Sequence, residues 1–238
     1  MIRVFLLLDH SSEFDRCLLR GIMRYSKEKG PWSFYRIPSA FQSPEHYEEV
    51  AKLAKKWRAD AIVGRWSDDK MHLLEDLHIP VVLQNYHNRS TVYSNITGDY
   101  KGTGVMAAKY FASHHYSNFA YFGIKGVVWS EERLLGYSSE VKRIGGKLYI
   151  YEKKTAEEQD WGELINWLSM LPEHTAIFCC DDERALSVTS QCRAHNIDIP
   201  SRVSVLGVDN DDLMCCLSDP NISSIQLGVE QGGYNLCA

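Results

Sequence analysis

The sequence predicts an α/β protein of two doubly wound lobes, each with a parallel sheet between layers of helices. Short apolar runs alternate with longer segments of helical periodicity along almost all of the 238 residues. The apolar runs are continuous, which is typical of strands that are buried on both faces of a parallel sheet. A polar segment without helical periodicity, at residues 84–99, separates two such series.

The alternative is a closed (β/α)8 barrel, because the strands are too many for one open sheet of ordinary size. The polar segment favours two lobes joined by a hinge. We therefore expect an N-terminal lobe of residues 1–96 and 227–238, and a C-terminal lobe of residues 97–226. A helix begins near residue 228 and does not finish, so we expect the N-terminal lobe to be truncated at its end.

The first half of the chain contains five predicted strands with three helical segments between them. Apolar side chains recur every three or four residues from Phe14 to Tyr25, which makes one face of a helix apolar. Ser43 and Pro44 are typical of the N-cap and first turn of a second helix. The expected strands are residues 2–8, 32–37, 59–64, 79–83 and 94–97, and the expected helices are 13–29, 44–57 and 68–77.

The second half repeats this scheme. We expect Asp99 to cap its first helix and Asp182 to cap a later one. Gly145 and Gly146 are expected to end one helix, and Pro172 another. The expected strands are residues 119–123, 147–151, 176–180, 203–208 and 222–225, and the expected helices are 99–115, 131–144, 157–171, 182–195 and one from 228.

Composition excludes several classes of protein. With 45% hydrophobic and 24% charged residues, the chain is neither a disordered tail nor a disulfide-rich miniprotein. The net charge of −5 and the absence of a basic stripe predict that the chain does not itself bind DNA. No apolar run reaches 18 residues, so we expect no membrane contact. Seven cysteines without CxxC spacing indicate reduced thiols, no metal and a cytoplasmic protein.

Sequence motifs of common enzymes are absent. The chain has no GxGxxG after its first strand, no P-loop, no GxSxG and no HExxH. We therefore expect no cofactor and a binding protein rather than an enzyme. A pair of carboxylates for glycoside hydrolysis would leave no such motif, so an enzyme stays a minor alternative.

Candidate ligand contacts follow the predicted strands, because ligands bind beyond the carboxyl ends of strands in open parallel sheets. Carboxylates, amides and arginines can pair with sugar hydroxyls, and aromatic rings can stack on sugar C–H faces. The simpler interpretations are turn aspartates, surface ion pairs and core packing. The candidates are Phe14, Asp15, Arg16, Asn85 with its neighbour Tyr86, Trp129, Arg133, Asp181 and Asp209.

Five segments together resemble the lactose/galactose-repressor family, in the order and spacing of that family. One is the helix start WSEERLLGY, in which an arginine precedes a glycine and an aromatic residue. Two others are strands that end in carboxylates, FCCDDERA and VSVLGVDN. The segments are residues 98–102, 129–137, 178–185, 203–210 and 222–226. The resemblance covers nearly the whole chain and implies a periplasmic-binding-protein-like effector domain.

Within this family the chain is most similar to xylose-responsive regulators. The similarity rests on residues 14–16, on Trp129 placed ahead of Arg133, and on residues 208–213. It implies two lobes that close on a pentose, D-xylose, and a homodimer. It also implies that operator DNA is bound through an AraC-like domain outside this chain. A sugar-binding transport protein of the same fold is the alternative, which the seven cysteines and the lack of a signal peptide disfavour.

The resemblance also implies roles for single residues. Arg133, Asp181 and Asp209 match positions that hold sugar hydroxyls, and Asn85 matches a position where sugar binders often carry Asp. Phe14 and Trp129 match positions that sandwich the sugar ring. The chain departs from the family in two places. Asp181 replaces the more usual Asn, so an ionised side chain there only accepts hydrogen bonds. Leu227 stands where a Gln often reaches the sugar.

Overall fold

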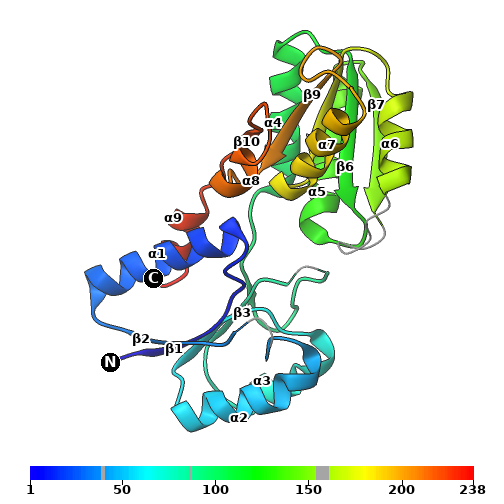
Figure 1. Ribbon diagram of the computed structural model, residues 1–238. Helices are drawn as coiled ribbons and strands as arrows, with labels where there is room; N and C mark the ends of the chain where they lie inside the picture. Colours follow the sequence, from blue (N-terminus) through cyan, green and yellow to red (C-terminus); the bar gives the residue numbers. More distant parts are fainter. Residues whose placement is uncertain (39–40, 86, 154–160) are drawn as a thin grey trace. The chain divides into compact units, whose positions relative to one another are not determined.

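The computed structural model describes residues 1–38, 41–85, 87–153 and 161–238. The chain divides into two compact units. Unit 1 consists of Met1–Thr97 and Gly228–Ala238, and unit 2 consists of Gly98–Leu227. Each unit is built on its own parallel sheet (Figure 1), which confirms the predicted fold class and excludes the closed barrel. Tyr86 and the expected helix start at residues 157–160 lie outside the described residues.

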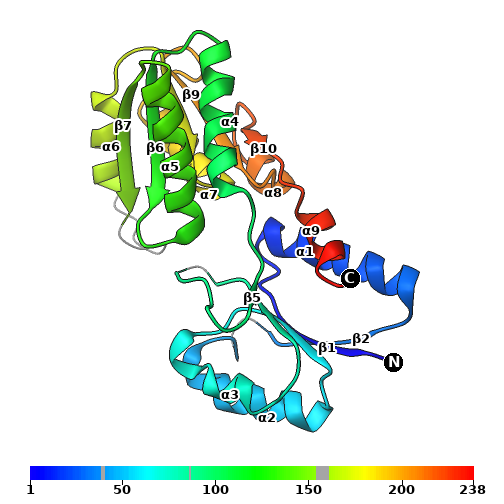
Figure 2. The ribbon, with the colours of Figure 1, turned by 180° about the vertical axis from the view of Figure 1, so that it is seen from behind.

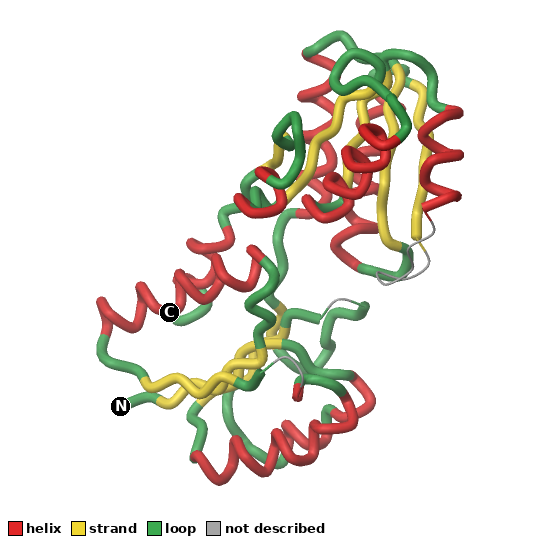
Figure 3. The backbone as a smooth tube through the Cα atoms, in the orientation of Figure 1, coloured by secondary structure: helices red, strands yellow, loops and turns green. Residues whose placement is uncertain are grey.

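Unit 1 has a five-stranded parallel sheet in the order β2-β1-β3-β4-β5. Helices α1 and α9 pack against each other on one face, where Val4 and Leu6 of the sheet meet Leu18 and Ile22 of α1. Helices α2 and α3 cover the other face (Figure 3). The strands are β1 (Arg3–Leu7), β2 (Ser33–Arg36), β3 (Ala61–Gly64), β4 (Val81–Leu83) and β5 (Ser94–Asn95). The helices are α1 (Glu13–Lys29), η2 (Pro44–His46), α2 (Tyr47–Trp57), η3 (Asp68–Lys70), α3 (His72–Glu75) and α9 (Val229–Asn235).

Unit 2 repeats this topology, with a parallel sheet in the order β7-β6-β8-β9-β10. Helices α4 and α5 lie side by side on one face (Figure 2), and α6 and α7 cover the other. The strands are β6 (Asn118–Ile124), β7 (Lys147–Lys153), β8 (Thr175–Cys179), β9 (Val203–Val208) and β10 (Ser223–Ile225). The helices are α4 (Tyr100–Ser113), α5 (Val128–Arg143), α6 (Trp161–Met170), α7 (Asp182–Ala194) and α8 (Asp212–Cys216).

Several local predictions are confirmed and others are wrong. Helix α1 has the predicted bounds, and Asp99 caps α4 by accepting the N–H of Gly102. Ser43 does not cap an α-helix, because a 3-10 turn intervenes and α2 begins only at Tyr47. Asp182 is not a cap either. Its neighbour Asp181 has the extended backbone of an N-cap and accepts the N–H of Arg184.

Two further observations bear on the classes of protein excluded above. No helix among the described residues is long and apolar enough to cross a membrane. All seven cysteines lie within the described residues as free thiols, and four of them are buried. Burial raises the pKa of the Cys179 and Cys180 thiols well above the ordinary range, so both stay protonated and unreactive at neutral pH.

Candidate functional site

Each unit has one point in its sheet where neighbouring strands continue into connections that run in opposite directions. In unit 1 this point lies between β1 and β3, and in unit 2 between β6 and β8. Ligands of open parallel sheets bind beyond the carboxyl ends of the strands at such points. An arginine–aspartate pair with one buried and one partly exposed partner occurs at this edge of each sheet, and each pair is described within its own unit.

The unit 1 pair is Asp15 with Arg65. Asp15 lies in the first turn of α1, is 1% exposed, and accepts the N–H of Asp9 at 2.6 Å. The same oxygen, Oδ2, accepts Nη2 of Arg65 at 2.7 Å. The other oxygen, Oδ1, is buried and has no hydrogen-bond partner among the described residues. Burial raises the pKa of Asp15, against the nearby charge of Arg65. A buried oxygen without a partner is a candidate acceptor for a ligand hydroxyl.

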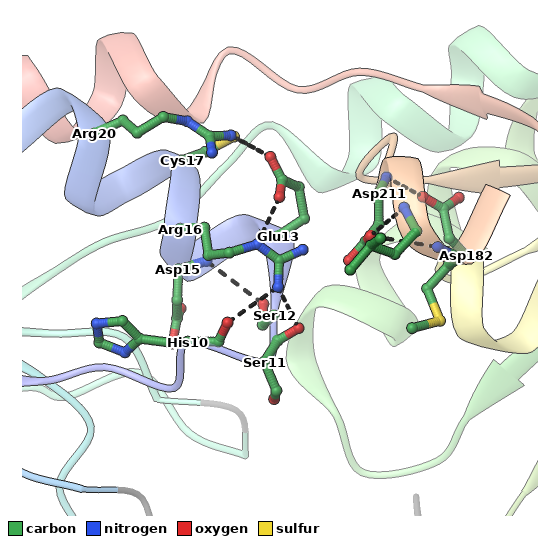
Figure 4. Close-up of polar contacts among 12 residues, drawn as sticks. His10, Ser11, Ser12, Glu13, Asp15, Arg16, Cys17, Arg20, Asp182 and Asp211 are labelled. Atoms are coloured by element: carbon green, nitrogen blue, oxygen red, sulfur yellow. Dashed lines mark hydrogen bonds and ion pairs between the residues drawn. The ribbon is translucent and has the colours of Figure 1, made fainter. Parts of the chain in front are cut away.

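Arg16 supports the loop between β1 and α1. Its Nε donates to the Glu13 carboxylate at 2.8 Å, and its Nη1 donates to the carbonyl oxygens of His10 and Ser11 at 3.0 and 2.7 Å (Figure 4). These contacts hold the loop that precedes Asp15. They favour a structural role for Arg16 over the predicted sugar contact, which stays a prediction.

The other two candidates of unit 1 are Asn85 and Phe14. Asn85 follows β4, and its side-chain oxygen accepts the N–H of Trp66 at 3.1 Å. Trp66 is buried and stacks on Tyr47 with 4.2 Å between the ring centres. Phe14 lies in the first turn of α1, is half-buried, and belongs to none of the hydrophobic clusters of the described core. An aromatic side chain outside the core at this edge agrees with a ligand-stacking role.

Arg133 is the central residue of the unit 2 edge. Its side chain is 2% exposed, and its Nη1 donates to the carbonyl oxygen of Cys180 at the end of β8. The guanidinium carbon lies 5.1 Å from the ring centre of Trp129 and 5.3 Å from that of Tyr100. These two cation–π contacts stabilise the buried charge, which is excluded from water.

Asp209 lies opposite Arg133. Its Oδ1 is 3.5 Å from Nη2 of Arg133, which is an ion pair without a hydrogen bond. Within the described part of the chain, neither Asp209 Oδ1 nor Arg133 Nε has a hydrogen-bond partner, although both atoms are buried. Burial raises the pKa of Asp209 to about 6, opposed by the charge of Arg133. A hydroxyl group can donate to such a carboxylate and accept from such a guanidinium.

Asp181 lies at the same edge of unit 2, and both of its carboxylate oxygens already bond to Arg184. One of its oxygens accepts the N–H of Arg184 at 2.8 Å, and the other pairs with Nη1 of Arg184 at 2.9 Å. Its charge is one of the influences that raise the pKa of Asp209. The cap and the ion pair are the roles visible in the structure, and the predicted sugar contact stays a prediction.

The structure thus brings the predicted residues Trp129, Arg133 and Asp209 together, with Asp181 at the same edge. Phe14 and Trp129 belong to different units, so their predicted sandwich of a sugar ring stays a prediction. Sequence reasoning noted Arg65 after a strand but did not select it for the site, and it missed Tyr100. Arg65 follows a predicted strand directly, the same signal that indicated Asp209, whereas the contact of Tyr100 with Arg133 joins two helices and has no local signal.

Comparison with known proteins places these observations in a family. The family model of the periplasmic binding protein-like domain matches residues 108–238. The xylose operon regulatory protein of Haemophilus influenzae is 26% identical over 98% of this chain and 62% of its own length. The protein of the same name from Escherichia coli K12 is 25% identical over 98% of this chain and 61% of its own length. The chain therefore spans about three-fifths of these relatives.

Solved structures share the fold. A structure described as the xylose-binding transcription activator xylR has a TM-score of 0.79 and 22% identity, over 98% of this chain and 60% of its own. The trehalose repressor from Escherichia coli has a TM-score of 0.78 and 18% identity, over 98% and 89%. A regulator from Alkaliphilus metalliredigens, complexed with D-xylulofuranose, has a TM-score of 0.77 and 18% identity, over 99% and 87%.

Proposed function

Because the chain belongs to the periplasmic binding protein-like family, we propose that it is a sugar-sensing effector domain of a bacterial transcription regulator. The proposed ligand is a pentose, D-xylose. Two of the relatives that match 98% of the chain are named xylose operon regulatory proteins, which supports this choice. Operator DNA would be bound by a part of the regulator outside these residues, in agreement with the net charge of −5.

The observation that carries the proposal is the pair of the buried Arg133 and the partly exposed Asp209. The Nε of Arg133 is a buried donor without a hydrogen-bond partner among the described residues, and Oδ1 of Asp209 is a buried acceptor without one. Such atoms need further hydrogen-bond partners. Neighbouring hydroxyls of a sugar supply both, since each hydroxyl donates one hydrogen bond and accepts others. The ring of Trp129, which already contacts Arg133, offers an apolar face for the C–H groups of the sugar.

In this proposal the chain is a regulator rather than an enzyme, and its homodimer presents two DNA-binding parts. Sugar binding controls transcription only if D-xylose binds one conformation of the regulator more tightly than another, because equal affinities would shift nothing. The unit 1 candidates Phe14, Asp15, Arg16 and Asn85 are proposed to contribute to sugar affinity as well.

The test is calorimetric titration with D-xylose of the wild type and the variants Arg133→Ala and Asp209→Ala. Each variant loses the hydrogen bond between a charged side chain and a sugar hydroxyl, which contributes about 1.5–3 kcal/mol, so each should bind D-xylose at least about tenfold more weakly. Arg143→Ala is the matched control, because Arg143 lies on the same helix, is exposed and pairs with Glu140. Wild-type affinity in both folded variants would remove the pair from the site.

Asp15→Asn tests the contribution of unit 1 separately. The substitution keeps the shape of the side chain and removes its charge beside Arg65. We expect weaker binding of D-xylose in a folded protein, because the Asn side chain keeps one oxygen to accept the N–H of Asp9 but replaces the unpartnered acceptor oxygen with an amide. Unchanged affinity would remove Asp15 from the proposed sugar contacts.

A further inference from the structure

Asp182 is a buried carboxylate for which the proposed function has no use. It is the first residue of α7 and its side chain is 2% exposed, while its neighbour Asp181 caps the helix. Its Oδ2 accepts the N–H of Asp211 at 2.7 Å (Figure 4), and its Oδ1 accepts the hydroxyl of Ser224 at 2.6 Å. Both oxygens therefore bond to other parts of unit 2.

These bonds converge on residues 209–211, the loop that follows β9. The Ser224 hydroxyl oxygen also accepts the N–H of Asn210 at 2.9 Å, while its own hydrogen is donated to Asp182. Two consecutive amides of the loop, those of Asn210 and Asp211, are therefore tied to Asp182, one directly and one through Ser224. The N–H of Asp209 bonds to the carbonyl oxygen of Ile225 at 3.0 Å.

The loop needs such support because its backbone is unusual. Asp209 has a φ of 101° and Asn210 a φ of 54°, both in the region that favours glycine. Residues other than glycine keep such angles only where their surroundings hold them there. The same angles direct the Asp209 side chain so that its Oδ1 lies 3.5 Å from Arg133.

Gly207 of β9 is a second observation that points to Asp182, because the Asp182 carboxylate occupies the space beside the Gly207 Cα. A Cβ atom at position 207 would lie 2.1 Å from Oδ1 of Asp182, far inside contact distance. Any larger residue at position 207 would therefore displace the Asp182 carboxylate from Ser224. Glycine is the residue type that leaves room for the hydrogen bond between Ser224 and Asp182.

We propose that Asp182 is a positioning residue, which fixes the loop at residues 209–211 and thereby holds Asp209 against Arg133 in the geometry that receives a sugar hydroxyl. The inference rests on the proposed function, since only there is Asp209 a ligand contact. Asp182 does not itself bind the sugar in this account, because its two oxygens are bonded to the protein and its side chain is buried.

Three variants separate the hydrogen bonds of Asp182 from its bulk. Asp182→Ala removes both bonds, and Ser224→Ala removes the link to Asn210. Asp182→Asn can keep both links, because its carbonyl oxygen can accept the Asp211 N–H and its amide can donate to Ser224. Circular dichroism and thermal unfolding show whether each variant is folded.

Two measurements follow, and the first needs no ligand. Hydrogen exchange of peptides that cover residues 207–216 reports on the Asn210 and Asp211 amides, which should exchange at least about tenfold faster in Asp182→Ala. Titration with D-xylose should show binding at least about tenfold weaker in the same variant, as expected when a buried hydrogen-bond network loses its centre. Ser224→Ala should change both in the same direction, and Asp182→Asn should restore both to within about threefold of the wild type.

The outcomes of these measurements decide whether Asp182 is a positioning residue. Unchanged exchange in Asp182→Ala, or wild-type affinity for D-xylose despite faster exchange, would overturn the positioning role. An Asp182→Asn protein that is folded and as impaired as Asp182→Ala would also contradict it. If Asp182→Ala does not fold, Ser224→Ala and Asp182→Asn carry the same test. If the wild type does not bind D-xylose, the proposed function fails, and the exchange of the loop amides alone decides whether Asp182 holds the loop.

Discussion

Burial dominates the ionisation of two carboxyl groups in unit 2. It raises the pKa of Asp182 to about 7 and that of Asp209 to about 6, from an ordinary value of 3.8. In the unfolded chain both groups lose their protons near the ordinary value. Between pH 4 and 7 the folded protein therefore binds more protons than the unfolded chain. The free energy of unfolding that depends on these groups must fall as pH rises through this range.

This pH dependence is testable with Asp182→Asn, which cannot ionise. We expect the free energy of unfolding of the wild type to fall more steeply between pH 5 and pH 8 than that of the variant. Urea denaturation at several pH values in this range measures both slopes. Asp212→Asn, at an exposed carboxylate of α8, is the control for the Asp-to-Asn substitution itself. Equal slopes for the wild type and Asp182→Asn would mean that Asp182 ionises alike in the folded and unfolded chains.

Single residues also show what the sequence can and cannot predict. Asp209 was predictable, because polar residues at the ends of apolar strands collect at one edge of a parallel sheet. Arg133 lies within α5, and the family resemblance of residues 129–137 indicated it. The roles within the adjacent pair Asp181 and Asp182 were not. Both residues suit a helix cap, and the extended backbone at Asp181 decides between them. The contact between Arg133 and Tyr100 depends on the packing of two helices and has no local signal.

Pairs of helices in both units approach each other through glycines. In unit 1, a Cβ at Gly21 of α1 would lie 1.9 Å from the carbonyl oxygen of Glu230, and one at Gly233 of α9 would lie 2.1 Å from that of Leu18. Helices α4 and α5 of unit 2 have the same arrangement at Gly104 and Gly136. Backbones this close leave no space for a side chain, so the glycines set the distance between the helices.

Gly233→Ala should therefore destabilise unit 1. The added methyl group meets backbone atoms that cannot move aside, and overpacking of this kind costs about 1–3 kcal/mol. Gly232→Ala is the matched control on the same helix, because a Cβ there meets no described atom within 4 Å. It should be neutral or stabilising by up to about 1 kcal/mol through helix propensity. Urea denaturation compares the two, and equal stabilities would contradict the close contact of α1 and α9.

Helices differ in how far their bounds were predictable. The periodicity of α1 and the termination at Gly30 fixed its extent. Helix α5 begins at Val128, three residues before the expected start, because Val127 and Val128 carry no capping side chain that could mark it. Helix α8 was missed, since five residues are too few for a periodic pattern. It exists because Asp211 caps it, accepting the N–H groups of Leu213 and Met214.

The two units have separate cores, and only unit 2 is a continuous stretch of chain. Unit 2 contains one sheet and two hydrophobic clusters of its own, within Gly98–Leu227. Unit 1 is completed by the C-terminal segment Gly228–Ala238, because α9 in this segment packs on one side of α1. The number of strands and the polar segment after β4 made two sheets predictable, and residues 227–238 were expected in the first lobe. The packing of α9 on α1 in particular joins distant segments and has no local signal.

A fragment of residues 98–227 should therefore fold alone. We expect helical circular dichroism and one cooperative denaturation transition, because each face of its sheet keeps its own helices. A fragment of residues 1–97 is the comparison and should be less stable, since it lacks α9 and exposes apolar side chains of α1 to water. A fragment of residues 98–227 without a cooperative transition would show that unit 2 depends on the rest of the chain.

The central claim is that this chain binds a pentose, and calorimetric titration tests it most directly. D-xylose is titrated into the protein beside arabinose, ribose, glucose and galactose under identical conditions. The account predicts saturable binding of D-xylose, with each of the other sugars at least about tenfold weaker, or 1.4 kcal/mol. Absence of binding for all five sugars, or equal affinity for them, would contradict it.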